Sequence, residues 1–102
     1  MKIIPIQAVP NQTFSVTLDG QTVTCKIYQR TPGLFFDLSL SGTPIVSGVI
    51  CRNMVPLVCR DYAGFSGNLM FMDQQGESDP DYTGLGDRYQ LAYLTADEYA
   101  LL

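Results

Sequence analysis

The stretch TFSVTLDGQTVTCKI, residues 13–27, decides the fold. Polar and apolar residues alternate on both sides of Asp19-Gly20, a pair typical of two-residue hairpin turns because a type I′ turn needs positive φ at both central positions. With this turn, positions whose numbers add up to 39 face each other. The apolar face then carries the pairs Phe14 with Cys25 and Val16 with Val23, and the hydroxyl face carries Ser15 with Thr24 and Thr17 with Thr22. The hairpin predicts a sheet with one face in a core.

The same period of two recurs after the hairpin. LFFDLSL, residues 34–40, predicts a third strand with Leu34, Phe36, Leu38 and Leu40 on one side. IVSGVIC, residues 45–51, predicts a strand in which Gly48 marks a bulge or a close backbone approach. A further strand is expected near residues 57–59. NLMFMD, residues 68–73, is apolar on both faces, which favours a central strand or one lying against a second protein surface.

The two ends of the chain complete the pattern. MKIIPI at the start predicts an edge strand, because Pro5 cannot donate to an interior ladder. YQLAYL, residues 89–94, predicts a last strand with Tyr89, Leu91 and Tyr93 on one face. TADEYALL then matches a capping box, since the side chains of Thr95 and Glu98 can each bond the other's backbone N–H, and predicts a short helix.

The expected fold is therefore mainly all-β: a small β-sandwich or barrel of about seven or eight short antiparallel strands with a short C-terminal helix. The chain has 102 residues, the size of one domain, so we expect a single β domain over residues 1–102. Hydrophobic residues make up 46% and charged residues 16%, enough apolar material for a core.

Composition excludes most familiar active sites. The chain has no histidine, so no His-based triad, His general base or His metal ligand can form. The three cysteines, Cys25, Cys51 and Cys59, lack the spacing and the fourth ligand of a zinc site and are expected to be free, mostly buried thiols made in a reducing compartment. No segment resembles a signal peptide or a membrane span. We expect no cofactor and no metal.

The charges are distributed unevenly. Residues 1–60 hold five basic and two acidic groups, a balance of +3, whereas residues 61–102 hold one basic and eight acidic groups, a balance of -7. The total of -4 has the wrong sign for binding a polyanion, so direct nucleic-acid binding is not expected. The asymmetry would permit head-to-tail contacts between copies or docking on a basic partner, and a solvated acidic face is the simpler interpretation.

Residues 74–88 form the longest expected loop and carry four acidic groups. Asp79 and Asp81 could contribute to a calcium site, but the spacing is not that of an EF-hand, and a solvated turn is favoured. The same carboxylates, with Asp37 or Asp61, would be the only material for a glycosidase-like pair, and the sequence does not set their separation. The expectation is that the protein is not an enzyme.

Several blocks resemble the baseplate plug proteins of contractile-tailed bacteriophages. IIPIQAVPNQTFSVTLDGQ, residues 3–21, is similar to the opening of that family. SLSGTPIVSGV (39–49), GNLMFMD (67–73), the Asp79-Pro80 loop with Leu85-Gly86, and Leu91-Ala92-Tyr93 resemble its later blocks in the same order. The resemblance covers essentially the whole chain.

The resemblance implies a structural virion protein that is made in the host cytoplasm and packs at the centre of the baseplate, near the tail tube and hub, where it helps to close the tail channel. It implies contacts with tube, hub and other baseplate proteins. From the charge asymmetry we also expect self-association in the assembly, and from the lack of a long apolar run no membrane contact. Candidate partner-interface residues come from the N-terminal edge, the two-sided strand and the acidic loop: Ile3, Ile4, Pro5, Ile6, Met70, Met72, Asp79, Asp81, Tyr82 and Arg88.

One alternative is a small β-barrel or sandwich that binds a sugar or another small ligand. Such a module would use tyrosines such as Tyr62, Tyr82 and Tyr89. A second alternative is a minimal cell-wall hydrolase built on Asp79 and Asp81.

Overall fold

The computed structural model describes residues 2–18, 20–31, 33–58 and 67–100. These ranges contain seven strands, one turn of 3-10 helix and one short α-helix. Their bounds are β1 (Lys2–Ile4), β2 (Asn11–Leu18), β3 (Gln21–Gln29), β4 (Leu34–Leu40), β5 (Thr43–Ile50), β6 (Asn68–Asp73), η1 (Tyr82–Gly84), β7 (Tyr89–Leu94) and α1 (Ala96–Ala100).

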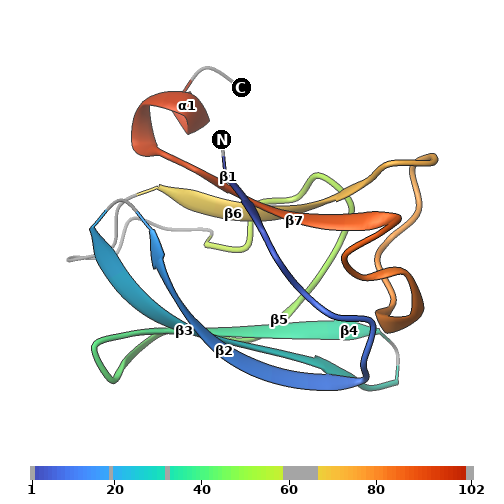
Figure 1. Cartoon of the computed structure of the whole chain (residues 1–102), viewed down its shortest axis with the longest axis horizontal. Helices are drawn as coiled ribbons and strands as arrows, with labels where there is room; N and C mark the ends of the chain where they lie inside the picture. Colours follow the sequence, from blue (N-terminus) through green and yellow to red (C-terminus); the bar gives the residue numbers. More distant parts are fainter. Residues whose placement is uncertain (1, 19, 32, 59–66, 101–102) are drawn as a thin grey trace.

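The strands form two antiparallel sheets that pack face to face (Figure 1). The four-stranded sheet has the order β2-β3-β4-β5, and the three-stranded sheet has the order β1-β7-β6. The predicted all-β fold with a short C-terminal helix is confirmed, and of the two expected architectures the sandwich is the one observed. After β1, residues 5–10 run from the three-stranded sheet to the start of β2 in the other, so the N-terminal segment joins the two layers.

The hairpin of β2 and β3 has the predicted register, with Phe14 opposite Cys25 and Val16 opposite Val23. Gly20 has φ +79°, the left-handed conformation that the turn requires. On the outer face, the hydroxyls of Ser15 and Thr24 lie 3.3 Å apart. The alternation of polar and apolar residues and the Asp19-Gly20 turn thus predicted this pairing correctly.

The pairing of β4 with β5 contains the predicted irregularity. Phe36 faces Val49 and Leu38 faces Val46, so β5 has one extra residue in this interval. Gly48 lies in the interval with φ +65°, and its N–H donates to the Asp37 carboxylate at 2.7 Å. The bulge is therefore held by a side chain of the neighbouring strand.

β6 is not the central strand that its two apolar faces favoured. It lies at the end of its sheet, and β7 occupies the centre. Residues 53–57 run along its outer side without forming a strand: the Met54 N–H donates to the Phe71 carbonyl at 2.8 Å and the Leu57 N–H to the Leu69 carbonyl at 2.8 Å. The strand expected near residues 57–59 is thus absent at 57–58, and Cys59 lies outside the described residues.

Both faces of β6 are nevertheless buried, as predicted. Leu69 and Phe71 face the space between the sheets and are fully buried in the main core, together with Leu91 and Tyr93 of β7. Met70 belongs to a second, smaller cluster with Ala92 and Leu94 on the other face of the three-stranded sheet. A strand at the end of a sheet can be apolar on both sides when other parts of the chain cover it.

Cys25 and Cys51 are free thiols buried in the main core, as expected. Burial raises the pKa of the Cys25 thiol to about 12 and also raises the pKa of the Cys51 thiol. Both groups are therefore neutral and unreactive at physiological pH.

The helix α1 begins with the predicted capping box. The Thr95 N–H donates to the Glu98 carboxylate at 2.9 Å, and the Glu98 N–H donates to the Thr95 hydroxyl at 3.3 Å. Across the described ranges, no helix combines the length and the apolar composition needed to cross a membrane.

Candidate functional site

The segment of residues 74–88, here called the acidic loop, joins β6 to β7 and reaches the other sheet along one end of the sandwich (Figure 1). The N–H of Tyr82 donates to the side-chain oxygen of Gln29 on β3 at 3.2 Å. The N–H of Gln74 donates to the Arg88 carbonyl at 2.7 Å, which closes the base of the loop. A loop fixed to both sheets presents a preformed surface.

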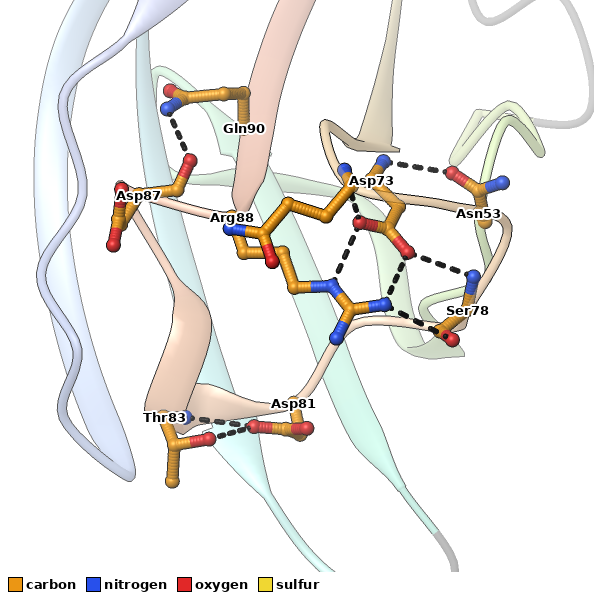
Figure 2. A network of polar contacts seen from close by, with 9 residues as sticks. Asn53, Asp73, Ser78, Asp81, Thr83, Asp87, Arg88 and Gln90 are labelled. Carbon is orange, nitrogen blue, oxygen red and sulfur yellow. Dashed lines mark hydrogen bonds and ion pairs between the residues drawn. The ribbon is translucent and has the colours of Figure 1, made fainter.

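An ion pair joins the two ends of the acidic loop (Figure 2). Arg88 donates from Nε to Asp73 Oδ1 and from Nη2 to Asp73 Oδ2, each at 2.8 Å. The backbone N–H groups of Gln75 and Ser78 donate to the same two oxygens, each at 2.9 Å. The fork of the guanidinium thus matches both oxygens of the carboxylate while the loop backbone folds around it.

This environment keeps Asp73 ionised. Its side chain is fully inaccessible, whereas that of Arg88 is 34% exposed. The hydrogen bonds from Arg88 hold the pKa of Asp73 far below its ordinary value, against the opposing effect of burial, and the two backbone donors lower it further. The carboxylate is an acceptor with its sites filled, so it serves the structure of the loop rather than proton transfer.

Asp79 and Asp81 also accept hydrogen bonds from the chain itself. Asp79 receives the Asn53 N–H at 3.0 Å and forms an exposed ion pair with Arg52 at 3.5 Å. Asp81 caps η1 by accepting the Thr83 N–H at 2.9 Å and the Thr83 hydroxyl. Within the described ranges, no group of three or more acidic or cysteine side chains is arranged to hold a metal ion.

The loop also contacts the N-terminal segment. Gly86 has φ +83°, and a side chain there would collide with the carbonyl oxygen of Ile6. The contact places the end of the acidic loop against the segment that links β1 to β2. Two of the regions proposed as partner surfaces are therefore adjacent.

Two shallow grooves accompany these segments. One, of about 420 Å³, lies between residues 5–9 and the first half of β2. The other, of about 430 Å³, is lined by Arg52, Asp79, Pro80 and Asp81 together with residues of β3 to β5 and Cys51. Neither is lined by Tyr82 or Tyr89.

The candidate interface residues differ in how much of each is exposed to solvent. Ile3 is 45% exposed, Pro5 is exposed and Ile6 is half-buried, whereas Ile4 is a core residue. On β6, Met70 is buried and Met72 half-buried. In the acidic loop, Asp79 and Asp81 are exposed, and Tyr82 and Arg88 are half-buried. The accessible members thus lie on the N-terminal segment and on the acidic loop.

The tyrosines proposed for a sugar platform do not form one among the described residues. Tyr89 is buried in the main core, and Tyr82 packs against the same core. Tyr62 lies outside the described residues, as does Asp61. Asp37, the other carboxylate considered for catalysis, accepts from Gly48 and from the Tyr28 hydroxyl on the outer face of the four-stranded sheet.

Several amide side chains have structural roles that the sequence did not predict, and three of them belong to Asn68, Gln12 and Asn53. Asn68 accepts the Val58 N–H at 2.9 Å and donates to the Val58 carbonyl at 2.6 Å, and Gln12 bonds both backbone groups of Gln7 in the same way. The third, Asn53, accepts the N–H of Asp73. No sequence pattern identifies such residues, because each partner comes from another segment.

The described residues thus form a small β-sandwich whose acidic loop is held in place by hydrogen bonds and an ion pair. The family model described as cyanophage baseplate Pam3 plug gp18 matches residues 1–97. The chain belongs to this baseplate plug family. The resemblance seen in the sequence is thereby confirmed, and membership supports a structural role in the tail baseplate of the virion. A search of curated proteins found no match.

Proposed function

We propose that the protein is a non-enzymatic plug that packs at the centre of the baseplate, near the tail tube and hub, and helps to close the tail channel. The observation that carries the proposal is the family match over residues 1–97. The braced acidic loop supports it, because a part that must hold its shape between larger proteins benefits from a preorganised surface.

The proposed contacts with tube and hub proteins use the accessible candidates. On the N-terminal segment these are Ile3 and Pro5, and on the acidic loop Asp79 and Asp81. Apolar groups on one segment and acidic groups on the loop that contacts it suit a partner surface that offers both apolar contacts and basic side chains. The proposal includes synthesis in the host cytoplasm and association with further copies in the assembly.

The test is cryo-electron microscopy of purified particles. We expect density for this chain on the tail axis, between tube and hub. A complete baseplate in which the chain lies away from the axis, or from which it is absent, would refute the proposed placement.

A matched pair of variants tests the acidic loop. Asp79→Asn with Asp81→Asn removes two charges and keeps hydrogen-bond acceptors, whereas Asp97→Asn changes an exposed charge on α1. We expect the double variant to enter particles less efficiently, measured by mass spectrometry of purified virions, and the Asp97 variant to enter normally. Equal incorporation of all three proteins would remove the loop from the proposed interface.

The non-enzymatic role is tested separately. Asp79 and Asp81 accept bonds from backbone N–H groups, which leaves them poorly suited to act as a general acid and base. We expect no fall in turbidity when the purified protein is added to bacterial cell walls. Clearing that disappears in the double Asn variant would establish a hydrolase instead.

A further inference from the structure

β2 forms the longest sheet edge with an unbroken register in the described ranges, and the Lys2 ammonium covers one of its carbonyls, that of Thr17. β1 has three residues and is followed by Pro5, β5 contains Pro44 and register shifts, and β6 is bordered by residues 53–57. β2, by contrast, has eight residues, an unbroken register with β3, and no proline or charged residue. Natural edge strands of this length are normally blocked or paired.

The direction of the backbone groups on β2 follows from two hydrogen bonds. The carbonyl of Pro10, just before the strand, accepts from Gln29 at the end of β3. The carbonyl of Thr17 instead accepts from the Lys2 ammonium at 3.2 Å, on the side away from β3. Because both backbone groups of a residue point to the same side in an antiparallel ladder, the odd-numbered residues Asn11, Thr13 and Ser15 direct their N–H and C=O groups outward.

The inner face of β2 also has apolar surface left to bury. Phe14 and Val16 are half-buried, whereas Val23 and Cys25, which face them on β3, are 0% exposed. The opposing sheet has one strand fewer than the sheet that contains β2. Pro5, Ile6, Val9 and Phe14 line the groove of about 420 Å³ beside the first half of the strand. Open hydrogen-bonding groups and partly exposed apolar side chains thus occur on the same strand.

We propose that the β2 edge binds the β2 edge of a second copy of this chain, antiparallel and related by a twofold axis. The strand is complementary to itself. With Ser15 of both copies opposite each other, Phe14 faces Val16 of the other copy on the inner side and Thr13 faces Thr17 on the outer side. This register joins outward-pointing odd residues to one another and keeps apolar with apolar and hydroxyl with hydroxyl.

The pairing creates one continuous sheet of eight strands and no contact between like charges on β2. Lys2 leaves the Thr17 carbonyl, an exposed acceptor that the second copy then supplies with a backbone donor. Such an isologous contact closes on itself and gives a dimer rather than a filament. The inference goes beyond the proposed function and stands without it.

The test is sedimentation velocity of the full chain from micromolar to millimolar concentration. We expect the mass to rise with concentration from 11.3 kDa toward twice that value. Ser15→Pro removes an outward N–H and leaves the β2–β3 ladder intact, so we expect dimerisation to weaken at least about tenfold while the fold is retained. A protein that stays monomeric throughout overturns the proposal.

A second pair of variants guards against misfolding of the proline variant. Thr13→Lys with Thr17→Lys brings cations together across the proposed twofold, whereas Thr43→Lys with Ser47→Lys adds the same charge to exposed positions of β5 at the opposite edge. We expect the first pair to abolish the dimer and the second to leave it unchanged. A dimer equally sensitive to both pairs would argue against the β2 edge.

Amide exchange locates the contact. In the dimer, the N–H groups of Thr13 and Ser15 are expected to become protected as concentration rises, while those of β5 do not change. A dimer without this protection, or one that persists in the Ser15 and Thr13/Thr17 variants, assigns self-association to another surface. Because these measurements use the isolated chain, their failure would leave the placement in the baseplate untouched.

Discussion

At the scale of single residues, the Asp73 carboxylate has two structural roles: it pairs with Arg88 and it binds the backbone of the acidic loop. The carboxylate neutralises the only basic residue among residues 61–102 and accepts two loop N–H groups as well. Loss of the carboxylate would leave a guanidinium and two backbone donors without their acceptor. The loop conformation therefore depends on the charge state of Asp73.

The first prediction concerns acid. A folded-state pKa below the unfolded value of about 3.9 means that Asp73 stabilises the fold above about pH 4, and that this contribution is lost as pH falls below it. Asp73→Asn should lower the Tm by roughly 5–10 °C at pH 7 and by progressively less below pH 4. Glu77→Gln, in an exposed position of the same loop, should leave the curve of Tm against pH close to wild type. Parallel curves for wild type and the Asp73 variant would contradict the assignment.

The second prediction distinguishes two costs of replacing a glycine: the strain of a left-handed backbone and the collision of the new side chain with a neighbour. Gly42 and Gly86 have nearly the same φ, +82° and +83°, but a side chain at Gly42 meets open space while one at Gly86 meets the Ile6 carbonyl. Gly42→Ala should destabilise the protein by about 1 kcal/mol, the effect of a left-handed alanine alone. Gly86→Ala should reach about 2–4 kcal/mol because the N-terminal segment must also shift. Urea unfolding measures both free energies of unfolding. Equal destabilisation by the two variants would show that the Ile6 carbonyl moves aside at little cost.

At the scale of elements, pairing between neighbours in sequence was predictable and pairing between distant segments was not. The β2–β3 register follows from Asp19-Gly20 and the alternation around it, and the bulge in β5 follows from Gly48. The place of β6 at the end of a sheet depends on β7 and on residues 53–57, which no local pattern specifies. Apolar residues on both faces of a strand predict that both faces are buried, but they do not predict the place of the strand in its sheet.

The third prediction compares two amides with the same bonding geometry. Asn68 and Gln12 each bond both backbone groups of one residue, Val58 and Gln7 respectively, but Asn68 is 3% exposed and the bonds of Gln12 are exposed. Asn68→Ala should destabilise the protein by about 2–4 kcal/mol because buried groups of Val58 lose their partners, whereas Gln12→Ala should lose less than about 1 kcal/mol because water replaces the amide.

Denaturant unfolding gives both values, and hydrogen exchange locates the effect. The Val58 amide should lose protection in the Asn68 variant before the core strands do. Similar destabilisation by the two variants would mean that burial does not decide the value of these bonds.

At the scale of the whole molecule, the candidate site illustrates what a sequence can reveal about a structural protein. The residues of the acidic loop were located correctly, because a long run with four acidic groups and little aliphatic content is visible in the sequence. Its rigidity was not predictable, because it depends on Asn53, Gln29 and Ile6 in three other segments. Likewise Ile4 and Met70 are candidates by composition, and only the packing of two sheets shows that they are buried.

The packing of both sheets against one core leads to the last prediction: the chain unfolds as a single unit. Cys25 lies on β3 in the four-stranded sheet, and Cys51 lies in the connection toward β6, yet both belong to the same buried cluster. In a Cys59→Ser variant, these two thiols are the whole thiol content of the chain.

Labelling of that variant with a thiol reagent at pH 8 should be at least ~10³-fold slower in the native protein than in urea, because each thiol must wait for global opening. The rates at Cys25 and Cys51, resolved by peptide mass spectrometry, should agree and should rise together with added urea. Faster labelling of Cys51 alone would mean that the connection to β6 opens by itself. In that case the three-stranded sheet, which carries both ends of the acidic loop, would separate from the four-stranded sheet before the rest of the molecule unfolds.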